Sequence, residues 1–163
     1  MKRFLPSGLM LFAGVLGIAG VAAHADQDIT KVPKKLDLRE SVLRKFFREK
    51  HSPAQNYTEV FLAEADAHHL DWRLLPSLAF VESGGGKTSK GNNLFGWANG
   101  KQTFNSISEA VHTVANALST GRRYRDKDTL GKLSTYNEHV DYPGMVMSIM
   151  RQISPTPDVV TAD

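Results

Sequence analysis

The sequence contains no cysteine among its 163 residues. This excludes disulfide bonds, thiolate metal sites and a cysteine nucleophile, so the fold must be stabilised by side-chain packing. The sequence also lacks a large excess of one charge, because it contains 20 lysines and arginines and 17 aspartates and glutamates. The basic residues are spread along amphipathic segments as on a solvated helix face, so no nucleic-acid partner is expected.

The longest apolar run, Leu9 to Ala23, follows two basic residues and ends at the small-x-small sequence Ala23-His24-Ala25. These features predict a cleaved signal peptide over residues 1–25 and export to the periplasm or the extracellular cell envelope. An uncleaved membrane anchor is the alternative, but the segment contains four glycines and its apolar run is shorter than the ~20 residues of a spanning helix. Cleavage would remove two basic residues and no acid, lowering the net charge from +3 to +1 and leaving no membrane contact.

The rest of the sequence predicts one mainly helical domain of the α+β class. Residues 26–56 are expected to form a polar linker and a first helix, from about Leu36 to Lys50. Residues 57–153 are expected to form the main domain, with Asn56 or Thr58 capping its first helix and Trp72 in the core. Apolar periodicity predicts its helices over about 57–68, 76–83, 107–120, 129–136 and 142–153.

The dipeptide Asn99-Gly100 is the strongest strand-pairing signal in the sequence. Both residues tolerate the positive φ that a tight hairpin turn requires. Leu94 to Ala98 and Lys101 to Phe104 flank it, so we expect a small two-stranded lobe. Residues 154–163 contain two prolines and are expected to form a disordered tail.

Glu82 lies at the end of a short predicted helix that has Pro76 in its first turn and Gly84 just past its last residue. A carboxylate in the last turn meets the negative end of the helix dipole, and the two preceding residues are apolar. Both effects favour the neutral carboxyl group, which is the form that a general acid needs. Taken alone, a glutamate at a helix end is more commonly a solvated surface residue.

Three segments resemble, in order and spacing, motifs of the lysozyme-like superfamily. They are Leu74 to Gly84, Asn92-Asn93-Leu94-Phe95-Gly96 and Tyr136-Asn137. The first two are closest to the mannosyl-glycoprotein endo-β-N-acetylglucosaminidase-like domain, and the third is more similar to lytic transglycosylases. The resemblance implies a lysozyme-like helical domain with a small β-hairpin lobe that cleaves the β-1,4 glycan strands of peptidoglycan.

The resemblance also implies roles for individual residues. Glu82 would be the catalytic acid, and Tyr136 would lie across the cleft, holding the N-acetyl group or steadying positive charge. The substrate would be bound by Ser83, Asn93, Phe95, Gly96 and Asn137. Phe95 and Trp97 are equally consistent with anchoring the hairpin to the helices.

A glycosidase ordinarily needs a second carboxylate besides its acid. Four residues are candidates by loop position: Asp126, Asp128, Glu138 and Asp141. None of these four residues lies in a distinctive motif. The sequence also departs from the transglycosylases, which usually have Ala-Gly after the Tyr-Asn pair, whereas Glu138-His139 follow Tyr136-Asn137 here. An N-acetylated sugar can replace the second carboxylate with its own acetamido oxygen, so we favour a mechanism with Glu82 as the single protein acid.

No metal site and no cofactor are predicted. His68 and His69 are adjacent, so on a helix their side chains point about 100° apart and cannot share one ion. His112 and His139 have no partner at ligand spacing.

The rival function, from another class, is a non-catalytic glycan-binding or scaffold domain of the same fold.

Overall fold

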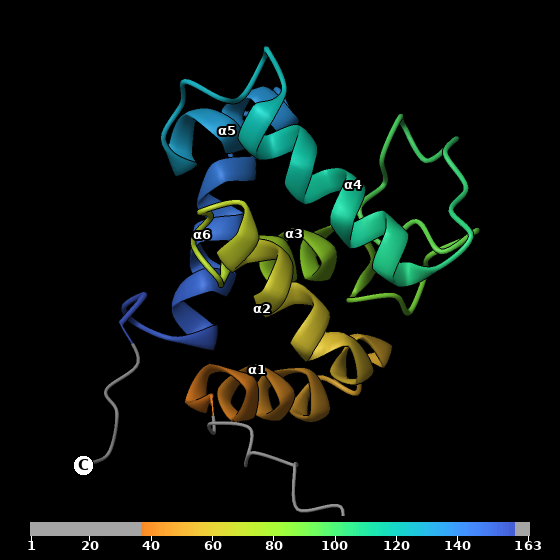
Figure 1. Cartoon of the computed structure of the whole chain (residues 1–163), viewed down its shortest axis with the longest axis vertical. Helices are drawn as coiled ribbons and strands as arrows, with labels where there is room; N and C mark the ends of the chain where they lie inside the picture. The colour runs from red at the N-terminus through yellow and green to blue at the C-terminus, as the bar shows by residue number, and fades with distance from the viewer. Residues whose placement is uncertain (1–36, 159–163) are drawn as a thin grey trace, which may run out of the picture. The chain divides into compact units, whose positions relative to one another are not determined.

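The structure is a computed structural model that describes residues 37–158. The predicted signal peptide, most of the predicted linker and residues 159–163 lie outside the described residues. The elements are α1 (Leu38–Glu49), η1 (Pro53–Tyr57), α2 (Thr58–Ala67), α3 (Leu74–Ser83), α4 (Ile107–Thr120), α5 (Thr129–Tyr136) and α6 (Tyr142–Ile153) (Figure 1). The prediction of a mainly helical domain is confirmed, and none of the helices in the described part is long and apolar enough to cross a membrane.

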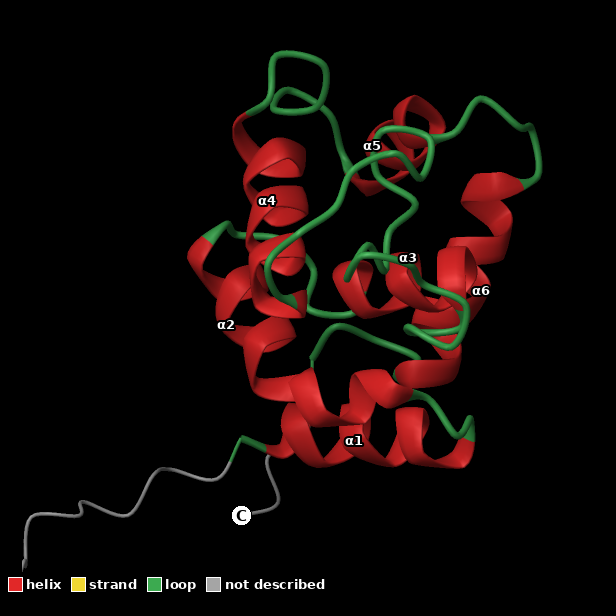
Figure 2. Cartoon of the chain, turned by 90° about the vertical axis from the view of Figure 1, so that its right-hand side faces the viewer, coloured by secondary structure: helices red, strands yellow, loops and turns green. Residues whose placement is uncertain are grey.

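Helix α3 lies in the middle of the described domain, where α2, α4 and α6 contact it (Figures 1 and 2). Its side chains Leu74, Leu75 and Leu78 are buried, and each contributes about 1.5–3 kcal/mol relative to an exposed position. Pro76 occupies its first turn, and Gly84 ends it with φ +63°. Both predicted helix boundaries are therefore confirmed, and Glu82 lies in the last turn.

The start of α2 differs from the prediction that Asn56 or Thr58 caps it. Ser52 is the capping residue instead, because its Oγ accepts a hydrogen bond from the backbone N–H of Ala54 at 3.3 Å. The 3-10 turn η1 begins at Pro53 and continues directly into α2 at Thr58. Since the chain is already helical there, α2 has no side-chain cap of its own.

Aromatic rings connect the first two helices with the loop that follows α3. Phe47, Phe61 and Phe95 are fully buried, and their ring centroids are 5.9 Å apart for the first pair and 6.5 Å for the second. Trp72 is also buried, as predicted. Phe95 thus holds the loop after α3 against the core by its side chain.

The predicted β-hairpin lobe is wrong: no strand occurs in residues 37–158 (Figure 2). Asn99 and Gly100 do adopt positive φ values, +56° and +75°, as the dipeptide indicates. However, Gly96 and Ala98 also have positive φ, +58° and +54°, and an extended strand excludes this conformation. The segment before the turn therefore cannot pair as a strand.

The side chain of Asn93 replaces the missing strand pairing. Its Nδ2 donates to the carbonyl oxygens of Trp97 and Gln102, both at 3.0 Å. Its Oδ1 accepts from the backbone N–H of Trp97 at 2.8 Å. A buried amide thus links the two arms of the loop, so this region keeps a defined shape without a ladder.

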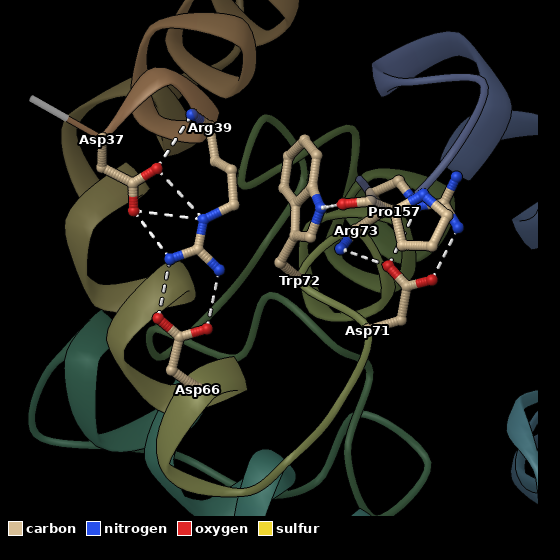
Figure 3. Close-up of polar contacts among 7 residues, drawn as sticks. All are labelled: Asp37, Arg39, Asp66, Asp71, Trp72, Arg73 and Pro157. Carbon is tan, nitrogen blue, oxygen red and sulfur yellow. Dashed lines mark hydrogen bonds and ion pairs between the residues drawn. The ribbon is translucent and has the colours of Figure 1, made fainter. Parts of the chain in front are cut away.

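Residues 154–158 are bound to the helical domain, so the prediction of a disordered tail is wrong for them. Arg73 donates to the carbonyl oxygen of Ser154 at 2.8 Å, and Trp72 Nε1 donates to that of Pro157 at 2.7 Å. Asp71 holds the Arg73 guanidinium at 2.6 Å (Figure 3).

A separate ion pair joins α1 to α2. Arg39 Nη1 lies 2.7 Å from Asp66 Oδ1, on the left of Figure 3.

Candidate active site

Glu82 borders two adjoining hollows on the surface of the domain. The larger, here called the main pocket, has a volume of about 650 Å³ and is lined by Glu82, Phe95, Gly96, Trp97, Ala98, Asn99, Gly100, Arg123, Tyr124, Tyr136 and Asn137. The smaller, the side pocket, has about 170 Å³ and is lined by Glu82, Ser83, Thr88, Ser89, Lys90, Asn93, Gly96 and Gly100. Glu82, Gly96 and Gly100 line both, so the carboxyl group lies where the two pockets meet.

Tyr142, the first residue of α6, holds the carboxyl group of Glu82. Its Oη donates a hydrogen bond to Glu82 Oε1 at 2.5 Å, and the residue is only 2% exposed. Burial, this hydrogen bond and the negative charge of Glu82 raise the pKa of Tyr142 well above its usual range. Tyr142 therefore keeps its proton and remains a donor to Glu82.

Sequence reasoning missed Tyr142 as a site residue and used it only to mark the start of α6. The contact joins residues 60 positions apart, which no local pattern indicates. The available signal was weak: a tyrosine at the start of an apolar helix face becomes buried, and its hydroxyl then needs a partner.

Gly96 lies directly against Glu82. Its φ is +58°, and a Cβ at this position would lie 2.9 Å from Glu82 Oε2. Any side chain would therefore displace the carboxyl group. Tyr142 thus holds Oε1 of Glu82 by a hydrogen bond, and the missing side chain of Gly96 leaves room for Oε2.

Tyr136 forms a wall of the main pocket and does not contact Glu82 by a hydrogen bond. Its Oη donates to the carbonyl oxygen of Phe95 at 2.6 Å. Its ring is stacked on Tyr142, with centroids 5.9 Å apart and planes 6° apart, and it also contacts Trp97. Burial and the charge of Glu82 raise the pKa of Tyr136, so its phenol is neutral. The donor proton is engaged, and the oxygen lone pairs remain as acceptors.

The other five predicted substrate-binding residues all line at least one of the two pockets but differ in burial. Ser83, Asn93 and the ring of Phe95 are buried and shape the loop, Ser83 by donating to the carbonyl oxygen of Leu94 at 2.8 Å. Asn137 is exposed. The sequence motif therefore combines residues that build the site with residues that face solvent in it.

None of the four candidate second acids lines either pocket. Asp128 caps α5 by accepting from the backbone N–H of Gly131 at 2.7 Å. Asp126 is exposed beside Arg125, Glu138 is exposed, and Asp141 borders a different groove along α6. Within residues 37–158, Glu82 is the single carboxylate at these two pockets, and no lysine or arginine there forms an ion pair with it.

The buried tyrosines give the stability of the protein a defined alkaline dependence. Because the folded pKa of Tyr142 is above the unfolded value of about 10, its stabilising effect is present below pH 10 and is lost as the pH rises further. Above pH 10, Tyr142 lowers the free energy of unfolding by about 1.4 kcal/mol for each pH unit. We expect the Tyr142→Phe variant to lack this contribution, so its free energy of unfolding should fall less steeply with pH. Urea unfolding of both proteins between pH 8 and pH 11 measures this, and equal slopes would contradict it.

The prediction that His112 lacks a partner is wrong. His112 Nδ1 lies 3.0 Å from Glu64 Oε2, and His68 Nε2 lies 3.4 Å from the same oxygen. Sequence reasoning compared His68 with its neighbour His69 and overlooked Glu64, which lies four residues earlier on the same face of α2. The i, i+4 spacing of Glu64 and His68 was the signal that could have found two of these three residues.

Comparison of the chain with protein-family models, with curated proteins and with solved structures gives no match. The resemblance to lysozyme-like enzymes therefore stays a prediction, and a function has to be inferred from the geometry around Glu82.

Proposed function

We propose that this protein is an exported glycosidase that cleaves the β-1,4 glycan strands of peptidoglycan, of the endo-β-N-acetylglucosaminidase or lytic transglycosylase type. The observation that carries the proposal is the position of Glu82, a single carboxyl group at the junction of two pockets. A polymer cleaved internally needs space for sugars on both sides of the broken bond. Two adjoining pockets that share Glu82 provide this arrangement.

The contacts of Glu82 suit a general acid. Tyr142 occupies Oε1, so the transferable proton belongs on Oε2, beside Gly96. Because Tyr142 stays protonated, it holds the same oxygen whether Glu82 is charged or neutral. The carboxyl group is thereby oriented before the substrate binds, which reduces the entropy lost on reaching the transition state.

The absence of a second acid among the lining residues favours assistance by the substrate. In this scheme Glu82 gives its proton to the glycosidic oxygen as the bond from that oxygen to the anomeric carbon breaks. The 2-acetamido oxygen forms a new bond to the anomeric carbon and closes an oxazolinium ring. Water then attacks this carbon and gives its proton to Glu82, or the O6 hydroxyl of the same sugar does so and forms a 1,6-anhydro ring.

Tyr136 has an acceptor to offer in this scheme. Its hydroxyl proton is directed to Phe95, so its oxygen can accept the N–H of the acetamido group. That hydrogen bond would orient the acetamido oxygen towards the anomeric carbon. Trp97, Tyr124 and Tyr136 supply aromatic surface for the sugar rings in the main pocket.

The test is digestion of purified cell-wall sacculi, with mass spectrometry of the released fragments. We expect soluble muropeptides; 1,6-anhydro ends would identify transglycosylation, and reducing N-acetylglucosamine ends would identify hydrolysis. Sedimentation of the protein with the sacculi without any released fragment would instead support the rival glycan-binding function.

The acetamido group can be tested in the same digestion. Sacculi from which the N-acetyl groups have been removed chemically should release at least 10-fold less material, because the substrate then lacks its nucleophile. Re-acetylated sacculi are the control and should be digested normally. Equal digestion of all three preparations would contradict assistance by the substrate and would require a second protein carboxylate.

A further inference from the structure

A second cluster of polar side chains joins α2 to α4 and takes no part in the pockets around Glu82. It consists of Glu64 on α2, His68 directly after the last residue of α2, and His112 on α4. One ligand atom of each residue lies within 4.8 Å of those of the other two. Glu64 and His68 are half-buried, whereas the side chain of His112 is 62% exposed. The cluster is therefore held on a fixed surface and is open to solvent on one side.

The spacing of these atoms is that of a metal coordination shell. Ligand atoms 2.0–2.1 Å from a tetrahedral ion are about 3.3–3.4 Å from one another. Glu64 Oε2 lies 3.4 Å from His68 Nε2 and 3.0 Å from His112 Nδ1. Both values are near the edge of such a tetrahedron, and the donor nitrogens of His68 and His112 lie within 4.8 Å of each other, so side-chain movement would close the shell around an ion.

Ser119 contacts the ring nitrogen of His68 that faces away from Glu64. Its Oγ lies 3.1 Å from the carbonyl oxygen of Asn116 and 2.9 Å from His68 Nδ1. When the hydroxyl proton of Ser119 is directed to Asn116, His68 Nδ1–H donates to Ser119 Oγ. In neutral His68 the lone pair of Nε2 then faces Glu64.

In this tautomer two acceptors, His68 Nε2 and Glu64 Oε2, face each other at 3.4 Å. A cation between them would remove their repulsion. Ser119 also has the position of an outer-shell group, because a histidine that binds a metal commonly donates its other ring N–H to an oxygen. Both features point to a positive ion at this place.

We propose that Glu64, His68 and His112 form a binding site for a divalent transition-metal ion of the zinc class. Two imidazoles and one carboxylate are a donor set that zinc accepts, whereas Mg²⁺ and Ca²⁺ prefer oxygen ligands alone. The exposed side of His112 leaves the fourth position to water. The bound ion ties the end of α2 to the first half of α4, independently of the glycosidase function proposed for Glu82.

The test is a calorimetric titration of the purified full chain without a histidine tag, after removal of metal with a chelator. We expect one Zn²⁺ ion per chain and no measurable binding of Mg²⁺. Co²⁺ bound at the same site should give the visible absorption of a tetrahedral nitrogen and oxygen complex. Absence of Zn²⁺ binding would overturn the proposal.

Variants locate the ion. His112→Ala removes an exposed ligand and should weaken Zn²⁺ binding by more than about 100-fold, whereas Ser119→Ala should weaken it by about 10-fold through the outer shell. His69→Asn is the matched control, because it removes the exposed neighbouring histidine and asparagine tolerates the φ of +52° there. Circular dichroism of each variant verifies its fold. Equal Zn²⁺ affinity of His112→Ala and His69→Asn would overturn the assignment.

Discussion

Replacing Glu82 by glutamine is expected to lower the rate of glycan cleavage by about 10³-fold, within the 10²–10⁴-fold range that general acid catalysis contributes. Glutamine has the shape of glutamate, and its amide oxygen can still accept the hydrogen bond from Tyr142. The substitution therefore removes the transferable proton and little else. The rate of muropeptide release from sacculi is the measurement.

Glu138→Gln is the matched control for this substitution. Glu138 is exposed, lies outside both pockets and was one of the candidate second acids. It should therefore retain the full rate of release. A large loss in Glu138→Gln with little loss in Glu82→Gln would reverse the roles assigned to these residues and would reject Glu82 as the acid.

Replacing Gly85 by alanine is expected to lower the free energy of unfolding by about 3 kcal/mol or more. A Cβ at this position would lie 2.1 Å from Ser52 Oγ, and the φ of +65° is strained for alanine. The strain costs about 1–2 kcal/mol, and overpacking costs a further 1–3 kcal/mol. The carbonyl oxygen of Gly85 also accepts hydrogen bonds from Ser52 and Ala54, which join the end of α3 to η1.

Gly100→Ala separates strain from overpacking in this prediction. Gly100 has a similar φ of +75°, but nothing lies within 4 Å of an added Cβ. It should therefore lose only about 1–2 kcal/mol from strain. Urea unfolding of both variants gives the two values. Equal losses would mean that the contact with Ser52 relaxes without cost.

The helix boundaries were predictable from the sequence where the signal and the hydrogen bond it makes lie within a few residues. Pro76 and Gly84 bracket α3, and Ser106 caps α4 through the backbone N–H of Glu109 at 3.1 Å. The apolar periodicity also placed α5 and α6 correctly. Such features depend on local geometry, so they are already specified in a short stretch of chain.

The hairpin prediction failed because the Asn99-Gly100 signal describes a turn and not the pairing of its arms. The turn formed with the expected positive φ values. Pairing requires extended backbone on both sides, and Gly96 and Ala98 are not extended. The amide of Asn93 instead supplied the hydrogen bonds between the arms, a competition that a propensity pattern does not include.

By itself, therefore, the sequence determined the helices, the ends of α3 and the last-turn position of Glu82, because these follow from contacts between near neighbours. Only the tertiary structure decided what surrounds that carboxyl group. Tyr142 reaches Glu82 across 60 residues, and His112 reaches Glu64 across 48. Side chains this far apart meet only when the helices that carry them have packed, and that packing depends on the whole core at once.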